Sequence, residues 1–284
     1  MDELESLRGW IGRSQALHDT ITPTPLAALA ATLDRDDPAP GAGTELPPLW
    51  HWLYFLPLAR AAELGPDGHP KRGGFLPPVP LPRRMWAGSQ FEFRSPVRVG
   101  DGVQRLSTIE DVTSKTGRSG ALVFVKVRHE LRCNGAAQPA LVEWHDIVYR
   151  EAKPPGAAEP PPQPAPQRAA WQREIVPDEV LLFRYSALTF NGHRIHYDRR
   201  YVTGVEGYPG LVVHGPLIAT LLLDLLHRQL PQADVAAFRF RAVRATFDGQ
   251  PFRIDGARDG LTVRLWAQDH EGWLTMDAVA TLRA

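Results

Sequence analysis

The feature that most constrains this chain is a segment that is apolar on nearly every side, "GPLIATLLLDLLHRQL" from Gly215. It carries no charge until Asp224, so a helix formed by this segment has no face suited to water. Pro216 suits the start of such a helix, because its fixed φ matches the first helical positions. We therefore predict a helix beginning near Gly215 that other elements bury on all sides.

Four runs of alternating apolar and polar residues follow this helix, and such alternation is typical of half-buried antiparallel strands. The turns "ARDG" from Ala257 and "DHEG" from Asp269 suit hairpins between them. The runs cover residues 236–247, 250–256, 261–268 and 273–283. The second half of the chain is thus predicted to be one helix followed by an antiparallel meander.

The first half repeats this order. Helical regions begin at Pro25 ("PLAALAATLDRD") and at Pro47 ("PPLWHWLYFLPLARAAEL"), and "SKTGRSG" from Ser114 suits a hairpin turn. A pattern Phe-x-Phe-Arg occurs at Phe91 and again at Phe238. The strand-like runs of this half cover residues 89–99, 103–114, 121–133 and 140–150. The matching order of elements predicts a tandem repeat of one fold.

A proline-rich segment separates the two halves: seven of the thirteen residues 154–166 are proline, which favours an extended, semi-rigid linker. An antiparallel sheet wrapped around one buried helix is the hot-dog architecture. The fold class is therefore predicted to be α+β, a tandem (double) hot-dog with two sheets, each around a central helix, joined edge to edge. We expect a degenerate first hot-dog over 1–152, the linker over 153–169 and a catalytic hot-dog over 170–284.

Composition narrows the partners. The 284 residues include 32 basic and 32 acidic ones, a balance that gives no electrostatic case for nucleic acid or an anionic membrane. The single cysteine, Cys133, excludes an intrachain disulfide and a thiolate metal cluster, and it favours the cytoplasm. The start "MDELESLRGWIG" is acidic, unlike a signal peptide, and the apolar runs are shorter than the roughly 20 residues of a membrane span.

The polar residues of interest cluster in "YSALTFNGHRIHYDRRYV", residues 185–202. A turn needs only Asn and Gly, and two histidines three residues apart are unusual in a solvated loop. A metal clamp, a catalytic loop and an accident of composition all fit this segment alone. The clustered side chains are Asn191, His193, Arg194, His196 and Asp198.

This segment resembles the hydratase motif of the MaoC-like, (R)-specific enoyl-CoA hydratase superfamily, in which an aromatic residue precedes Gly-Asp-x-Asn-Pro-Ile-His-x-Asp. Ile195, His196 and Asp198 match, whereas Asn191 stands at the acidic position and His193 and Arg194 replace Asn-Pro. "YPGLVVHGPLIATLL" is similar to the second signature, where His-Gly opens the helix. The variant "FNGHRIHYD", the linker and the arm "LPRRMWAG" resemble the group of mesaconyl-C4-CoA and itaconyl-CoA hydratases and type-2 3-hydroxyacyl-thioester dehydratases.

The resemblance implies roles for three catalytic candidates. His196 is the general acid/base, since imidazole exchanges protons near neutral pH. The Gly215 N–H, at a helix N-terminus, is the donor to the thioester oxygen. Asn191 cannot act as a base, but its amide could hold the attacking water. The alternatives are a core histidine satisfied by a carbonyl and a plain helix start.

Four further side chains are candidate substrate contacts. Arg194 could grip a carboxylate or a phosphate, or could simply pair with Asp198. Asp198 could support His196, although an Asx-type turn or an ion pair with Arg199 is the preferred interpretation. His193 and His214 could form a metal site with His196, but no carboxylate stands at an obvious ligand spacing, so no metal is expected.

The expected activity is interconversion of a 2-enoyl-CoA and its 3-hydroxyacyl-CoA, with a short, branched or dicarboxylic acyl group such as mesaconyl-C4-CoA or itaconyl-CoA. A 3-hydroxyacyl-thioester dehydratase of fatty acid synthesis, a hot-dog thioesterase and a non-catalytic acyl-CoA-binding protein are the alternatives. No cofactor is expected beyond the coenzyme A of the substrate. A homodimer is possible, although the tandem halves already supply the hot-dog pairing within one chain.

Overall fold

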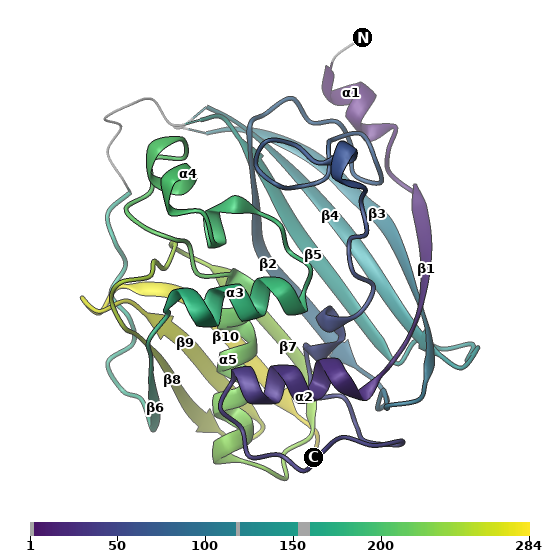
Figure 1. The fold of residues 1–284 in the computed structure, drawn as a ribbon, viewed down its shortest axis with the longest axis vertical. Helices are drawn as coiled ribbons and strands as arrows, with labels where there is room; N and C mark the ends of the chain where they lie inside the picture. Colours follow the sequence, from purple (N-terminus) through teal and green to yellow (C-terminus); the bar gives the residue numbers. More distant parts are fainter. Residues whose placement is uncertain (1–2, 118–119, 153–159) are drawn as a thin grey trace.

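The computed structural model describes residues 3–117, 120–152 and 160–284, and Figure 1 shows a layer of strands with helices gathered on one face. The ten strands described form one antiparallel sheet in the order β1-β3-β4-β5-β2-β7-β10-β9-β8-β6. The N-terminal half contributes β1 (Ser14–Thr20), β2 (Arg83–Phe93), β3 (Gly102–Gly117), β4 (Gly120–Cys133) and β5 (Leu141–Arg150). The C-terminal half contributes β6 (Trp171–Ile175), β7 (Val235–Ala242), β8 (Phe252–Asp259), β9 (Thr262–Gln268) and β10 (Leu274–Leu282).

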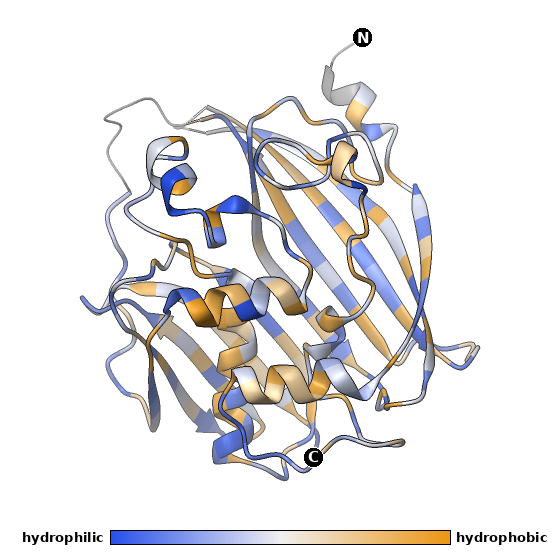
Figure 2. Cartoon of the chain, in the orientation of Figure 1, coloured by the Kyte–Doolittle hydropathy of each residue, from blue (hydrophilic) through white to orange (hydrophobic). Residues whose placement is uncertain are grey.

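The two halves meet edge to edge where β2 pairs with β7, as predicted. Phe91 stands directly opposite Phe238 in this pair, and both side chains are buried with ring centroids 6.0 Å apart. The repeated Phe-x-Phe-Arg pattern therefore lies at the centre of the sheet, in the two strands through which the halves pair. Along the strands, hydrophobic and hydrophilic residues alternate (Figure 2), so one face of the sheet is available for the core.

The buried helix is α5 (Gly215–Gln229), and it begins at the predicted residue. Every residue from Leu217 to Leu226 is buried, which confirms that the segment has no solvent face. The helix packs against β6, β8, β9 and β10, so the C-terminal strands enclose it. This half is therefore a hot-dog, in which the sheet wraps around one helix.

The N-terminal half departs from the prediction of a central helix in each half. The helix expected from Pro25 is present as α2 (Pro23–Thr32), which packs against α3 (Glu179–Leu188). The helix expected from Pro47 was wrong: the segment holds only two short 3-10 turns, η1 (Trp50–Leu53) and η2 (Ala61–Glu63). Leu49 and Phe55 have left-handed φ values of 71° and 56°, and Pro57 cannot donate a helical hydrogen bond, so no α-helix continues through them.

The aromatic residues of this segment nevertheless enter the core. Trp50, Tyr54 and Phe55 are buried, and they occupy part of the volume that a long helix would fill. The remaining helical elements are α1 (Glu3–Arg8), η3 (Arg194–His196) and α4 (Arg199–Gly204). None of the described helices is both long enough and apolar enough to cross a membrane.

The proline-rich linker falls partly outside the described residues, because 153–159 are not among them, and the same holds for 118–119 in the predicted hairpin turn. Its second part lies against the C-terminal half. Pro164 forms a bridge with Trp273, and Ala165 is buried against Trp266. The domain limits at 152 and 170 stay predictions.

Candidate active site

The candidate site is built on the loop that joins α3 to α4. The backbone turns at Phe190, whose φ of 49° is left-handed, and the Asn191 N–H donates to the Ser186 carbonyl oxygen at 2.8 Å. The Asn191 side-chain oxygen accepts from the His193 N–H at 3.0 Å, which closes an Asx turn. Asn191 therefore uses its amide oxygen to shape the loop, and its NH₂ group remains to meet a ligand.

His196 lies at the end of this loop and is 7% exposed. Its Nδ1 lies 2.7 Å from the carbonyl oxygen of Val212, and because a carbonyl only accepts, Nδ1 carries the hydrogen and Nε2 keeps its lone pair. Burial lowers the pKa of His196 to about 4, against the opposing effect of the Val212 carbonyl. At neutral pH the residue is thus a neutral imidazole with a fixed tautomer and an available proton acceptor.

His214 packs face to face on His196, with ring centroids 3.7 Å apart and an interplanar angle of 17°. It is 1% exposed, and its Nε2 lies 2.8 Å from the Ser186 hydroxyl. Its buried Nδ1 has no hydrogen-bond partner among the described residues. Burial, together with the charge His196 would carry, pushes the pKa of His214 well below its usual value. The stacked pair places the start of α5 beside His196.

Gly215 is the first residue of α5, with His214 at the N-cap position and a proline in the first turn. The first N–H groups of an α-helix have no partner within the helix, and the helix dipole makes them suitable for negative charge. A Cβ built on Gly215 would meet no described atom within 4 Å. The side of the helix start on which a side chain of residue 215 would stand is therefore open.

Arg194 and Asp198 interact mainly with each other. The guanidinium donates to the Asp198 carboxylate at 3.0 and 2.8 Å and to the Pro66 carbonyl oxygen at 3.0 Å, and it lies 4.2 Å over the Tyr201 ring. Asp198 also caps α4 by accepting from the Tyr201 N–H. The predicted ion pair between Asp198 and Arg199 is absent from the described residues, since Arg199 pairs with Glu179 and Asp248. Substrate binding by Arg194, His193, His214 and Asp198 stays a prediction.

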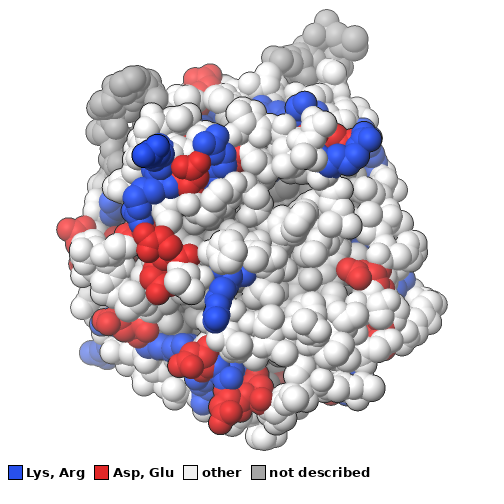
Figure 3. Space-filling view, in the orientation of Figure 1, with Lys and Arg blue, Asp and Glu red and all other residues white. Residues whose placement is uncertain are grey.

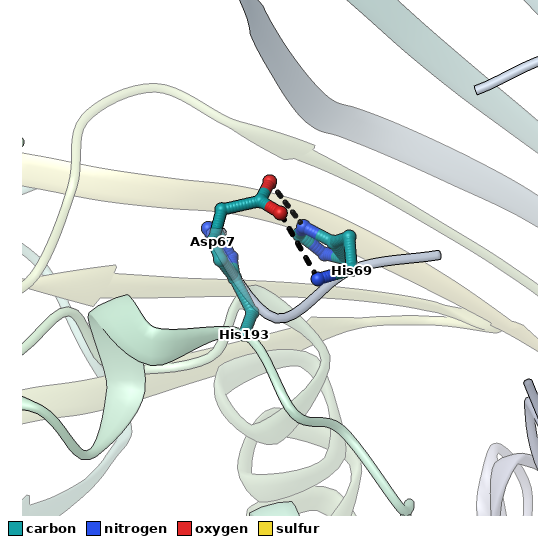
Figure 4. A group of neighbouring side chains, drawn as sticks. All are labelled: Asp67, His69 and His193. Carbon is teal, nitrogen blue, oxygen red and sulfur yellow. Dashed lines mark hydrogen bonds and ion pairs between the residues drawn. The ribbon is translucent and has the colours of Figure 1, made fainter. Parts of the chain in front are cut away.

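The sequence did not point to two residues that the fold brings to the site from the N-terminal half, Asp67 and His69 (Figure 4). The His69 Nδ1 lies 3.2 Å from the Asp67 carboxylate, which also accepts from the His69 N–H at 3.1 Å. The His69 ring packs on His193 at a centroid distance of 3.9 Å. The only sequence signal was an acidic residue and a histidine in the turn "GPDGHP", about half the chain away from their partners.

The turn that carries Asp67 is locked onto the loop that joins α3 to α4, which holds the candidate catalytic residues and is called the catalytic loop below. The Arg194 N–H donates to the Asp67 carbonyl oxygen at 2.9 Å, and Gly68 has a left-handed φ of 88°. A Cβ on Gly68 would come within 1.9 Å of the Gly192 carbonyl oxygen, so only glycine allows this close approach. The two halves of the chain thus build one site together.

Among the described residues, one group of side chains could hold a metal ion. It consists of Asp67, His69 and His193, whose donor atoms lie within 4.8 Å of one another. In the structure the Asp67 carboxylate instead accepts from His69, and this hydrogen bond is the main cause that lowers the pKa of Asp67 far below its usual range. Burial lowers the pKa of His69, and it lowers that of His193 to about 2. Asp67 is therefore ionised and both imidazoles are neutral at neutral pH.

Charged side chains of both signs are interspersed on the helix-bearing face, and its middle is mostly uncharged (Figure 3). This face has no extended basic surface of the kind that binds nucleic acid. One antiparallel sheet around a buried helix, with a neutral histidine beside the N–H groups that open that helix, is the arrangement expected of a double hot-dog enzyme that acts on acyl thioesters.

Comparison with known proteins agrees with this class. The family profile of hydroxyacyl-thioester dehydratase type 2 matches residues 49–248. The chain is 47% identical over 281 residues to a mesaconyl-C(4)-CoA hydratase of Chloroflexus aurantiacus, covering 96% of each chain. It is 26% identical to a mitochondrial hydroxyacyl-thioester dehydratase type 2 of Schizosaccharomyces pombe, covering 84% of this chain and 88% of that one.

A solved Mycobacterium tuberculosis protein with a double hot-dog fold superposes with a TM-score of 0.57 at 12% identity, covering 98% of this chain and 97% of that one. At this identity the likeness shows the fold alone. The family match over most of the chain shows more: the protein belongs to the hydroxyacyl-thioester dehydratase type 2 family. It is a hydro-lyase that interconverts 2-enoyl and 3-hydroxyacyl thioesters.

Proposed function

We propose that this protein hydrates a short dicarboxylic or branched 2-enoyl-CoA, with mesaconyl-C4-CoA as the first candidate and itaconyl-CoA as the second. The choice of substrate rests on the 47% identity to the Chloroflexus mesaconyl-C(4)-CoA hydratase across nearly the whole of both chains. The 26% identity to a mitochondrial dehydratase keeps a fatty 3-hydroxyacyl thioester as the second class.

In this proposal His196 exchanges a proton with the water molecule that adds to the β-carbon (Cβ) of the substrate's acyl chain. Its Nδ1–H is held by the Val212 carbonyl, so Nε2 is the nitrogen that can accept a proton. In hydration, Nε2 takes a proton from water while the water oxygen bonds to Cβ. In dehydration, the protonated nitrogen returns that proton to the leaving hydroxyl. Hydration and dehydration follow the same path in opposite directions, so both need the His196 ring in one orientation. The hydrogen bond to the Val212 carbonyl provides that orientation.

The start of α5 supports the electronic part of the same step. Addition at Cβ moves the π electrons of the double bond toward the thioester oxygen, which becomes an enolate oxygen. The Gly215 N–H stands at a helix N-terminus, a position that stabilises such charge. Asn191 would orient the water through its NH₂ group, because its oxygen is engaged by His193. These steps need no cofactor besides the coenzyme A of the substrate.

Mass-resolved turnover tests the proposal. Purified protein is given mesaconyl-C4-CoA, itaconyl-CoA, crotonyl-CoA and a longer enoyl-CoA, and the gain of one water is measured. We expect a short dicarboxylic or branched substrate to react fastest, and His196→Ala to lose about 100-fold or more in kcat/KM. Preferred turnover of the longer enoyl-CoA would favour the fatty thioester, and release of free coenzyme A would favour a thioesterase.

We also infer a cytoplasmic location, which the single cysteine supports. The oligomeric state is a separate matter, since one chain already contains both hot-dog halves. Light scattering would reveal a homodimer as twice the mass of the chain.

A further inference from the structure

The hydration of a double bond requires proton handling at two carbons. Water loses a proton as its oxygen bonds to Cβ, and Cα gains one as the enolate collapses. His196 can serve the first position, but Asn191 carries an amide, which has no proton to exchange near neutral pH. The site therefore needs a second titratable group, and the N-terminal half brings one to it.

His69 has the arrangement of a proton-transfer residue. Its Nδ1 faces the Asp67 carboxylate at 3.2 Å, so Nδ1 carries the hydrogen and Nε2 keeps the lone pair. A carboxylate in this position fixes the tautomer and stabilises the imidazolium when it forms. Figure 4 shows Asp67 and His69 in contact, with His193 beside them on the catalytic loop.

The position of this pair connects it with His196. His69, His193, His196 and His214 follow one another with ring-centroid separations of 3.9, 5.5 and 3.7 Å. The side chain of His69 keeps 26% of its surface exposed, whereas His196 and His214 are buried. The interlock of Gly68 with Gly192 holds the turn in place, so the orientation of the pair does not depend on a free loop.

We propose that His69, oriented by Asp67, is the second acid/base group of this site and serves Cα. This inference rests on the proposed hydratase function. It assigns the role that an acidic residue at position 191 would play to a histidine contributed by the other half of the chain.

The dehydration direction shows how protons and electrons balance. Nε2 of neutral His69 takes the proton from Cα, and the C–H electron pair becomes the Cα=Cβ double bond. The Cβ–O bond breaks, and the hydroxyl leaves as water with a proton from protonated His196. The proton on His69 then returns to His196 through solvent. Hydration runs through the same steps in reverse, with His69 giving its proton to Cα.

The charges around His69 set its pH dependence. Asp67 on its own turn favours the imidazolium, whereas Arg84 on β2 disfavours it. His193 and His196 on the catalytic loop are neutral neighbours at neutral pH. Removal of the Asp67 charge must therefore lower the pKa of His69 and shift any activity limb that His69 controls to lower pH.

The experiment measures kcat/KM for hydration of the enoyl-CoA identified above, from about pH 5 to about pH 9, in His69→Gln and Asp67→Asn. His69→Gln is expected to lose about 100-fold or more, because a positioned acid/base group contributes at least that much. Because His69 must be protonated to give its proton to Cα, Asp67→Asn is expected to move the alkaline limb of the profile to lower pH. Matched controls are His270→Gln and Asp234→Asn, which change an exposed histidine and an exposed carboxylate of the C-terminal half.

Full activity of folded His69→Gln would overturn the proposal. So would a loss of rate in Asp67→Asn with an unmoved alkaline limb, since that is what a purely structural pair would give. Activity that is lost with a chelator and restored by Zn²⁺ would reassign the cluster as a metal site. If His69→Gln does not fold, as judged by circular dichroism, the limb shift in Asp67→Asn decides. A native protein that hydrates no thioester would instead refute the proposed function.

Discussion

At the scale of single residues, the burial of His196 links the catalytic site to stability. Its pKa falls from the ordinary 6.5 to about 4 in the folded chain. Between these values the unfolded chain binds a proton that the native chain does not, so the free energy of unfolding decreases as the pH falls. The contribution is complete above pH 6.5 and is lost toward pH 4, and at about 1.4 kcal/mol per pKa unit it amounts to about 3 kcal/mol.

Urea unfolding checks this at about pH 7 and about pH 4.5. His196→Gln removes the titrating ring, so we expect this variant to lose about 2 kcal/mol less stability on acidification than the native protein. His270→Gln, at an exposed position, should behave like the native protein. Equal losses in all three proteins would contradict a buried neutral His196.

Gly215→Ala separates the two possible roles of that residue. Its φ is not left-handed and a Cβ would meet no described atom within 4 Å, so the substitution should change stability by less than about 1 kcal/mol. The new methyl group would stand in open space beside the helix N-terminus, next to the expected position of the thioester oxygen. We therefore expect kcat/KM to fall about 100-fold while the melting temperature holds. Unchanged activity would mean that Gly215 is only a helix start.

At the scale of elements, the sequence predicted those parts that local patterns determine. The strands β3–β5 and β7–β10 follow from alternation, and α5 follows from its uniformly apolar surface. The run predicted over 89–99 overlaps β2 (Arg83–Phe93) only from Ser89 to Phe93. The short edge strands β1 and β6 and the helix α3 were not predicted. The signal for α3 was Asp178, whose side chain accepts from the Leu181 N–H as an N-cap. The apolar run at Pro47 forms no α-helix, and its prolines argue against one.

The site shows the same division. His196, His214 and Gly215 lie in two neighbouring stretches of sequence, and the resemblance to a known motif identified them. Asp67 and His69 belong to a glycine- and proline-rich turn, and no local pattern tells which distant loop such a turn will meet. Their contact with His193 depends on the pairing of the two halves through β2 and β7. A tertiary contact of this kind becomes visible only in the folded chain.

The interlock between the two loops can be tested with a pair of glycines. Gly68 and Gly73 both have a φ of 88°, but a Cβ on Gly73 would meet no described atom within 4 Å. Gly73→Ala should cost about 1–2 kcal/mol for the left-handed backbone alone. Gly68→Ala adds a clash with the Gly192 carbonyl oxygen, so we expect a further loss of about 1–3 kcal/mol, with lower activity. Equal melting temperatures of the two variants would contradict the interlock.

At the scale of the whole molecule, one buried carboxylate connects segments of both halves. Asp224, in the middle of α5, is almost fully buried and pairs with Arg35 at 2.8 Å and with Arg173 and Arg228 at 2.7 Å. Arg35 follows α2 in the N-terminal half, and Arg228 also donates to the Leu33 carbonyl oxygen at 3.0 Å. The Asp224 carboxylate lies in an otherwise apolar helix, and its ion pair with Arg35 connects that helix to the first half of the chain.

Asp224→Asn should therefore destabilise the whole molecule. It leaves three arginines without their shared carboxylate, and removal of one partner of a buried ion pair typically costs about 3–5 kcal/mol. Asp234→Asn is the matched control, because its exposed pair with Arg283 should contribute about 1 kcal/mol or less. Urea unfolding followed by circular dichroism measures both. Since one sheet runs through both halves, we expect a single transition shifted to lower urea, and two separate transitions would show that the halves unfold independently.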